Sequence, residues 1–175
     1  MKYNEKTLEV ENIYKGKIIN LNVHKVILPN NTTANREIVV HPGAVAILPI
    51  DEEGKIIFVN QFRKAVEEEL LEIPAGKIEV GEDPKKCAMR ELEEETGFLA
   101  SQLMFMNKIY TSPGFSDEVI YIYLAKDLTI GKKNLDEEEF IDLYKYSFVD
   151  ALNLIKSGGI KDAKTIAAIL LMQNY

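Results

Sequence analysis

The chain has one cysteine and no tryptophan, and it lacks both a long apolar run and an excess of basic residues. The single cysteine, Cys87, excludes an internal disulfide and cannot form a thiolate metal site alone, so we expect a small buried residue rather than a reactive thiol. No apolar run approaches the roughly 18 residues that span a bilayer, and the N-terminus lacks the apolar region of a signal peptide. We therefore expect a cytoplasmic protein that does not bind membranes.

The acidic residues are concentrated in one segment. The 175 residues include 21 lysines and arginines against 28 aspartates and glutamates, a net charge of −7. Residues 67–95 alone hold 11 acids and 4 bases, which already gives −7, whereas acids and bases cancel in the other 146 residues. This distribution argues against an acidic disordered protein and against a nucleic-acid binder with a basic face. It indicates a local requirement for carboxylates.

Strand and helix signals predict an α/β (α+β) fold, with a mixed β-sheet between helices. Asp83-Pro84 is a strong helix start and Gly97 a strong stop, which predicts a helix of about 13 residues between them. Apolar alternation, turn residues and amphipathic spacing predict the other elements. The expected strands are Ile18–Leu28, Arg36–Val40, Ala44–Ile50, Lys55–Phe62, Leu103–Tyr110, Val119–Ala125 and Phe140–Ser147, and the expected further helices are Phe148–Ser157 and Asp162–Gln173.

The predicted central helix carries glutamates where a helix tolerates them least. Glu93, Glu94 and Glu95 occupy its last turn, where the helix dipole disfavours anions by several tenths of a kcal/mol each. Glu91 and Glu95 are four residues apart, so two like charges face each other, and Glu94 joins the same face. On composition alone, a solvated acidic face is the commoner explanation. A hard divalent cation such as Mg²⁺ would remove both penalties, because it binds carboxylate oxygens.

A longer pattern surrounds this helix. Gly76, five residues, Glu82, seven residues and then Arg90-Glu91-Leu92-Glu93-Glu94-Glu95-Thr96-Gly97-Phe98 resembles the Nudix box, the signature of the Nudix hydrolases. The resemblance implies hydrolysis of a nucleoside diphosphate linked to another group, with Mg²⁺ as the cofactor and Mn²⁺ able to substitute. It also implies that Glu91, Glu94, Glu95 and the carbonyl of Ala75 bind the metal, that Glu95 is catalytic, and that Gly76, Glu82, Arg90 and Gly97 support the site.

Segments outside the box resemble the ADP-ribose pyrophosphatase branch, namely Arg36–Val45, Gln61–Arg63, Leu71–Lys77, Tyr110–Glu118 and Glu137–Asp142. The resemblance implies that ADP-ribose and water give AMP and ribose 5-phosphate. It further implies a homodimer in which the strands of residues 1–40 are exchanged, beside a Nudix hydrolase domain at residues 41–175. The implied substrate-binding residues are Arg36 and Glu37 at the adenine, Arg63 at the diphosphate, Lys77, and Ser112, Pro113, Gly114 and Glu118 beside the terminal ribose.

Some assignments stay open. The acidic run Asp136–Glu139 matches a loop that supplies a late catalytic glutamate, and Glu139 is our first choice as general base or extra metal ligand, Glu137 our second. The alternative is a solvated loop. His41 stands where relatives often have a substrate-contacting arginine, but a plain strand-end residue explains it equally well. Without tryptophan, adenine stacking would need another residue or the flat face of Arg36.

Two other functions fit the same pattern. The first is a Nudix hydrolase that acts on a different nucleoside diphosphate derivative, such as another nucleotide sugar, NADH or a damaged nucleotide. The second is a module that senses a nucleotide without cleaving it.

Overall fold

The computed structural model describes residues 3–135 and 139–175, so Glu137, the second candidate for the general base, lies outside the described residues. The chain forms two units. Met1–Gly43 and Tyr110–Val119 make up the first, and Ala44–Ile109 and Ile120–Tyr175 make up the second. The first unit therefore takes in a segment, Tyr110–Val119, that lies far from the N-terminal strands in the sequence.

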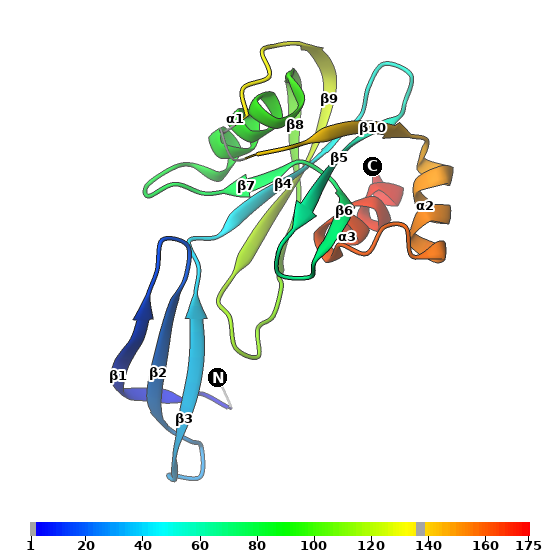
Figure 1. The fold of residues 1–175 in the computed structure, drawn as a ribbon. Coiled ribbons are helices and arrows are strands. Elements are labelled where there is room, and N and C mark those ends of the chain that lie inside the picture. The colour runs from blue at the N-terminus through cyan, green and yellow to red at the C-terminus, as the bar shows by residue number, and fades with distance from the viewer. Residues whose placement is uncertain (1–2, 136–138) are drawn as a thin grey trace. The chain divides into compact units, whose positions relative to one another are not determined.

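The first unit contains an antiparallel sheet in the order β1-β2-β3 (Figure 1). Its strands are β1 (Lys6–Lys15), β2 (Asn20–Ile27) and β3 (Thr33–Val40). The expected strands at Ile18–Leu28 and Arg36–Val40 correspond to β2 and to the end of β3. The sequence did not predict β1, because register shifts between Thr7 and Glu9 and between Asn12 and Tyr14 interrupt its apolar alternation.

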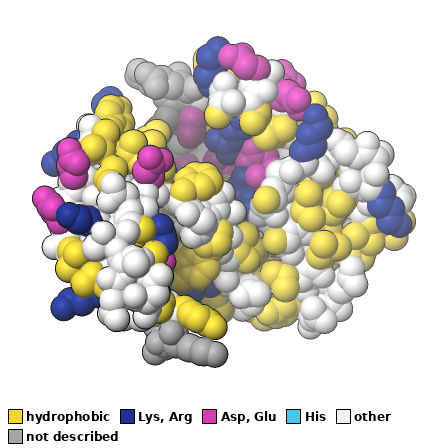
Figure 2. All heavy atoms as spheres, turned by 90° about the horizontal axis from the view of Figure 1, so that it is seen from below, with side chains coloured by type: hydrophobic (Ala, Val, Ile, Leu, Met, Phe, Trp, Pro, Cys, Tyr) yellow, Lys and Arg dark blue, Asp and Glu magenta, His cyan; other side chains and the backbone are white. Residues whose placement is uncertain are grey.

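This sheet has little core of its own. Every residue of β1 is exposed, and Leu8, Val10 and Ile13 each leave about half of their surface in solvent, at 49%, 52% and 52%. Among the described residues of the unit, Val26 is the buried hydrophobic side chain. Figure 2 shows hydrophobic side chains exposed among acidic and basic ones on one face of the protein.

The second unit contains two sheets and three α-helices (Figure 1). The four-stranded sheet has the order β7-β4-β9-β8 and is mixed, because β4 runs parallel to β9 and antiparallel to β7. Its strands are β4 (Ala44–Pro49), β7 (Ala75–Lys77), β8 (Phe98–Tyr110) and β9 (Val119–Ile130). The three-stranded sheet, in the order β10-β5-β6, consists of β5 (Ile56–Arg63), β6 (Glu68–Glu72) and β10 (Asp142–Tyr146).

The helices cover both faces of the mixed sheet. They are α1 (Pro84–Thr96), α2 (Phe148–Ser157) and α3 (Ala163–Leu171), the last continued by a 3₁₀ turn at Met172–Asn174. Val45 and Ile47 of β4 pack with Cys87 and Leu92 of α1. Their neighbours Ala46 and Leu48 point to the other face, into a cluster with residues of α2 and α3. This alternation confirms the predicted α/β (α+β) fold, with a mixed sheet between helices.

The helix bounds were the most accurate prediction. Asp83 caps α1 by accepting hydrogen bonds from the N–H groups of Lys85 and Lys86, and Gly97 ends the helix with φ 75°. The strand bounds were less accurate, because β8 begins at Phe98, β9 continues to Ile130, and β6 and β7 are short edge strands without a clear apolar pattern. Cys87 is fully buried and burial raises its pKa to about 12, so it is the inert residue that the sequence predicted. No helix in residues 3–135 or 139–175 is long and apolar enough to cross a membrane.

Candidate active site

Arg90 lies at the centre of the acidic face of α1. Its Nε and Nη2 atoms each donate to the carboxylate of Glu82 at 3.0 Å, and its Nη1 donates to Glu91 at 2.7 Å and to Glu94 at 2.9 Å. The guanidinium lowers the pKa of Glu82 to about 2, mainly through these hydrogen bonds. Arg90 therefore ties the loop before α1 to the helix.

Glu95 is the most deeply buried carboxylate on this helix, with 3% of its surface exposed. Its Oε2 accepts a hydrogen bond from the backbone N–H of Ala75 at 3.0 Å, which joins the end of α1 to the start of β7. Burial, helped by the nearby charges of Glu91 and Glu139, raises the pKa of Glu95 to about 8. Burial likewise raises the pKa of Glu91. Like charges held out of water in this way favour either a proton or a cation.

Gly76 makes room for one of these carboxylates. A Cβ atom at this position would lie 1.8 Å from Cδ of Glu91 and 2.0 and 2.3 Å from its two oxygens. Gly76 therefore lets the Glu91 carboxylate lie against the backbone of β7, and any side chain at this position would displace that carboxylate. Lys77, the next residue, is exposed, and its carbonyl accepts a hydrogen bond from Sγ of Cys87 at 3.3 Å.

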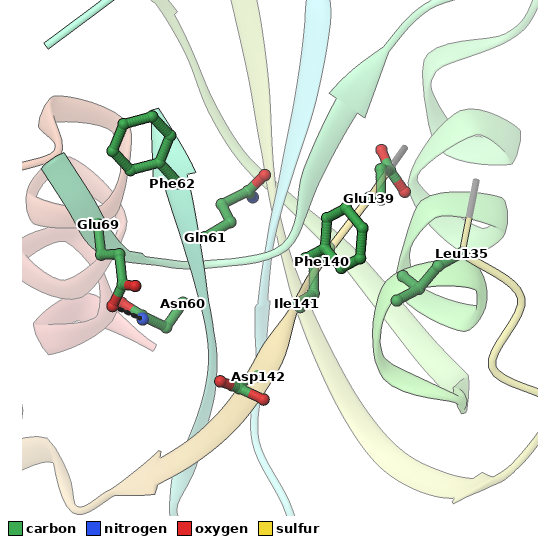
Figure 3. Close-up of a pocket in the computed structure, with 9 residues that line it drawn as sticks. All are labelled: Asn60, Gln61, Phe62, Glu69, Leu135, Glu139, Phe140, Ile141 and Asp142. Carbon is green, nitrogen blue, oxygen red and sulfur yellow. Dashed lines mark hydrogen bonds between the residues drawn. The ribbon is translucent and has the colours of Figure 1, made fainter. Parts of the chain in front are cut away.

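Glu139 belongs to the same group of charges. Its carboxylate raises the pKa of both Glu91 and Glu95, which places it close enough to act on either side chain. It also lines a pocket of about 510 Å³ (Figure 3). Asn60, Gln61 and Phe62 of β5 lie on one side of this pocket, and Glu139 and Phe140 lie opposite them. The other lining residues are Glu69, Leu135, Ile141 and Asp142.

The chain leading toward Glu139 is anchored to the last turn of α1. The N–H of Gly131 donates to the carbonyl of Gly97 at 2.8 Å, and the N–H of Asn134 donates to the carbonyl of Glu94 at 3.0 Å. Glu93, to which the sequence assigned no role in the site, accepts from the N–H of Lys132 through Oε1 at 3.2 Å. The bonds from Gly131 and Asn134 satisfy carbonyls that the helix end would otherwise leave unpaired, and all three bonds hold this segment beside the end of α1.

The donor set fits a hard divalent cation. Glu91, Glu94 and Glu95 have carboxylate oxygens and Ala75 has a backbone carbonyl, which are the ligand types that such a cation binds. Burial raises the pKa of two of these carboxylates, Glu91 and Glu95. Within the described residues, no three His, Cys, Asp or Glu side chains are already arranged as a metal site. Nη1 of Arg90 donates to both Glu91 and Glu94, so in this structure the positive charge beside these two carboxylates is the guanidinium.

Arg63 lies near the carboxylates of α1 and is only partly engaged in ion pairs. Its Nε and Nη2 donate to the two oxygens of Glu72 at 2.7 and 2.8 Å, and its charge acts on Glu95. The side chain remains 40% exposed. It therefore presents a partly exposed cation beside the carboxylates, which suits the diphosphate contact that the resemblance implies.

The other substrate-binding candidates lie in the first unit. Arg36 forms a two-bond ion pair with Glu5, at 2.9 and 2.7 Å. Arg36 and Glu37 are neighbours on β3, so their side chains point to opposite faces of the sheet and are not brought together. His41 accepts a hydrogen bond from the N–H of Gly43 through Nδ1 at 3.1 Å, and Nδ1 is 3.7 Å from Oε1 of Glu118.

Ser112, Pro113 and Gly114 form a tight turn in the first unit. The N–H groups of Phe115 and Ser116 both donate to the carbonyl of Ser112, at 3.1 and 2.9 Å. Glu118, four residues beyond Gly114, accepts from Oγ1 of Thr111 at 2.7 Å. The structure thus groups the predicted ribose-binding residues in one short segment.

Sequence reasoning missed a buried ionic network behind Arg63. Glu72 is 1% exposed and contacts Lys164 of α3 as well as Arg63. A glutamate between Leu71 and Ile73 in an apolar strand was the available signal. The acidic run Glu67–Glu69 also had no assigned role, and its members pair with Lys64, Lys161 and Asn60 respectively.

Comparisons with known proteins agree with this arrangement. Residues 40–169 match the sequence model of the NUDIX domain. The chain is 50% identical over 171 residues to the ADP-ribose pyrophosphatase of Bacillus subtilis, covering 97% of this chain and 92% of that protein. It is 48% identical over 174 residues to the methanol dehydrogenase activator of Bacillus methanolicus, covering 98% and 94%. It is 36% identical over 167 residues to the ADP-ribose pyrophosphatase of Mycobacterium tuberculosis, covering 94% and 81%.

A solved structure described as an ADP compounds hydrolase has the same fold. It superimposes with a TM-score of 0.87 at 24% identity and covers 98% of this chain and 93% of that one. Residues 40–169, which match the NUDIX domain, contain Gly76, Arg90 and the glutamates that contact them on α1. The chain belongs to the Nudix family.

Proposed function

We propose that the protein hydrolyses the diphosphate bond of ADP-ribose to AMP and ribose 5-phosphate, with Mg²⁺ as the cofactor and Mn²⁺ able to substitute. The observation that carries the proposal is the 50% identity, over nearly the whole of both chains, to an ADP-ribose pyrophosphatase. The acidic face of α1 and the half-exposed Arg63 beside it supply the groups that this chemistry needs.

The chain's own residues divide the work. Glu91, Glu94, Glu95 and the carbonyl of Ala75 would hold the cation, which when bound would neutralise diphosphate oxygens and lower the barrier to attack by water. Arg63 binds a diphosphate oxygen through its exposed edge. Glu139 accepts the proton of the attacking water, since its carboxylate is exposed at the pocket and acts on Glu91 and Glu95. Gly76 leaves room for the Glu91 carboxylate, and Arg90 ties the preceding loop to the helix.

The direct test is a substrate panel. We expect the protein with MgCl₂ to release AMP from ADP-ribose with a higher kcat/KM than it shows for GDP-mannose, NADH or damaged nucleotides, and EDTA to abolish the activity. GDP-mannose belongs in the panel because GDP-mannose pyrophosphatases are relatives at 30% identity. Absence of AMP, with turnover of another diphosphate, would reassign the substrate. Tight binding of ADP-ribose without turnover in either metal would instead indicate a sensing module.

We also propose a homodimer in which residues 1–40 pair with the partner subunit. The support is β1, an edge strand with exposed apolar residues and no core of its own. Analytical ultracentrifugation should give the mass of two chains, and Leu8→Lys together with Val10→Lys should shift the protein to one chain. A parental protein that sediments as a monomer at all concentrations would contradict the proposal.

A second candidate function rests on the 48% identity to a methanol dehydrogenase activator. That relative covers this chain as completely as the pyrophosphatase does, so activation of a methanol dehydrogenase is the second candidate function. The test adds the protein to a methanol dehydrogenase assay with Mg²⁺. An unchanged dehydrogenase rate would remove this candidate and leave the pyrophosphatase proposal intact.

A further inference from the structure

One buried carboxylate in the second unit is shared by two cations. Glu72, the last residue of β6, is 1% exposed. Arg63 donates to both of its oxygens, at 2.7 and 2.8 Å, and the ammonium of Lys164 contacts Oε2, the same oxygen that Nη2 of Arg63 contacts. The two cations therefore compete for one carboxylate.

The start of α3 fixes the position of Lys164. The lysine side chain is 10% exposed, and its Nζ lies 3.1 Å from Asp162. Asp162 caps α3 by accepting from the N–H of Thr165 at 2.9 Å, and Oγ1 of Thr165 accepts from the N–H of Ile73 at 2.9 Å. Lys164 therefore lies in the first turn of α3, which is hydrogen-bonded through Thr165 to Ile73, the residue after Glu72.

A buried lysine at this point needs a reason beyond packing. Removing a charge from water is costly, and well-packed apolar residues often stabilise a protein as well as a buried ion pair does. The four charges Arg63, Lys164, Glu72 and Asp162 cancel as a set. Without Lys164, the single positive charge of Arg63 would interact with two negative charges. These are Glu72, its ion-pair partner, and Asp162, whose charge also acts on Arg63.

Arg63 uses only one edge in this network. Its Nε and Nη2 atoms are engaged, whereas Nη1 has no hydrogen-bond partner among the described residues, and the side chain is 40% exposed. The charge of Arg63 reaches Glu95 on α1. The free edge is therefore the part of the side chain that can meet an anion.

We propose that Lys164 is a positioning residue for diphosphate binding: by sharing Glu72 and offsetting Asp162, it leaves the positive charge of Arg63 available to the substrate. The proposal rests on the proposed function, since it assigns Arg63 to the diphosphate. It also makes α3, which is distant in sequence from the Nudix box, part of the substrate-binding apparatus.

The test measures ADP-ribose kinetics with Mg²⁺ and the Kd of the uncleavable α,β-methylene analogue of ADP-ribose. For Lys164→Met we expect KM and the analogue Kd to rise about tenfold, the size that loss of a residue orienting a binding group produces, with kcat changed much less. Lys164→Arg should restore most of the affinity. The matched control is Lys161→Met, because Lys161 also pairs with a glutamate of β6 but in solvent, with 57% of its side chain exposed.

A double-variant comparison separates positioning from stability. In an Arg63→Met background, Lys164→Met should raise the analogue Kd no further, because the residue through which it acts is gone. A lowered melting temperature with unchanged KM and Kd would overturn the proposal and leave Lys164 a structural residue, as would an equal effect of Lys164→Met with and without Arg63. If the parent binds the analogue but does not cleave ADP-ribose, the proposed function fails while this comparison still decides the role of Lys164. A parent that does not bind the analogue overturns both.

Discussion

Replacing Glu95 with glutamine is expected to lower kcat for ADP-ribose by roughly 10³-fold while the fold is retained, because several kcal/mol of charge stabilisation depend on the metal. Glu95 is 3% exposed and accepts from the N–H of Ala75, and a glutamine oxygen can accept the same bond. Steady-state kinetics with Mg²⁺ and circular dichroism of the same samples check both parts. The matched control is Glu79→Gln, an exposed glutamate of the same box, which should keep the parental rate.

The same variant should change how stability depends on pH. Burial raises the pKa of Glu95 from 4.5 to about 8, so the folded protein holds this proton more tightly than the unfolded chain does. The metal-free protein should therefore lose stability as pH rises from 4.5 to about 8. Mg²⁺ replaces the proton, so its stabilising effect should grow over this interval, and both trends should be weaker in Glu95→Gln. Thermal melts with and without Mg²⁺ measure them. Parental turnover by the variant would show that Glu95 is not a ligand.

Gly76→Ala is expected to have the next largest effect, a loss of about 10²-fold in kcat/KM, since displacement of a catalytic group by about 1 Å has this consequence. The new Cβ would lie 1.8 Å from Cδ of Glu91, so this carboxylate must move. The loss should appear as a weaker apparent affinity for Mg²⁺ in titrations of activity and of melting temperature.

Gly159→Ala is the control for that change. Its Cβ would meet a flexible methyl, Cδ2 of Leu154, at 3.0 Å, and it lies at the end of α2, far in sequence from the box. It should therefore cost some stability without altering the response to Mg²⁺. An unchanged Mg²⁺ requirement in Gly76→Ala would contradict the assignment of Glu91 as a ligand.

Local signals accounted for the parts of the molecule that the sequence predicted well. Asp83 and Gly97 determine the ends of α1 through hydrogen bonds to residues within one turn, so they could be read from neighbouring positions. The spacing of the glutamates on α1 also placed Glu91, Glu94 and Glu95 on a shared acidic face, because helical periodicity fixes their relative directions. The strand β1 was missed for the opposite reason, since its two bulges break the two-residue period.

The contacts that sequence reasoning could not supply join distant residues. Lys164 reaches Glu72 across 92 positions, and no local pattern relates a lysine in the first turn of a helix to a glutamate at the end of a strand. The hydrogen bonds that anchor Lys132 to the Glu93 carboxylate and Asn134 to the Glu94 carbonyl are also long-range, and the second satisfies a carbonyl that the end of α1 leaves unpaired. Tertiary packing, rather than composition, decides such partners.

The hydrogen bond from Ile73 to Thr165 sets an order on folding. The segment that carries Ala75 and Gly76 lies in the first half of the chain, but one of its anchors is the hydroxyl of a residue 92 positions later. During synthesis α1 can form soon after it emerges, whereas this anchor exists only once the start of α3 has also been made. A residue of α3 is therefore needed to anchor the strand segment that leads into Ala75 and Gly76.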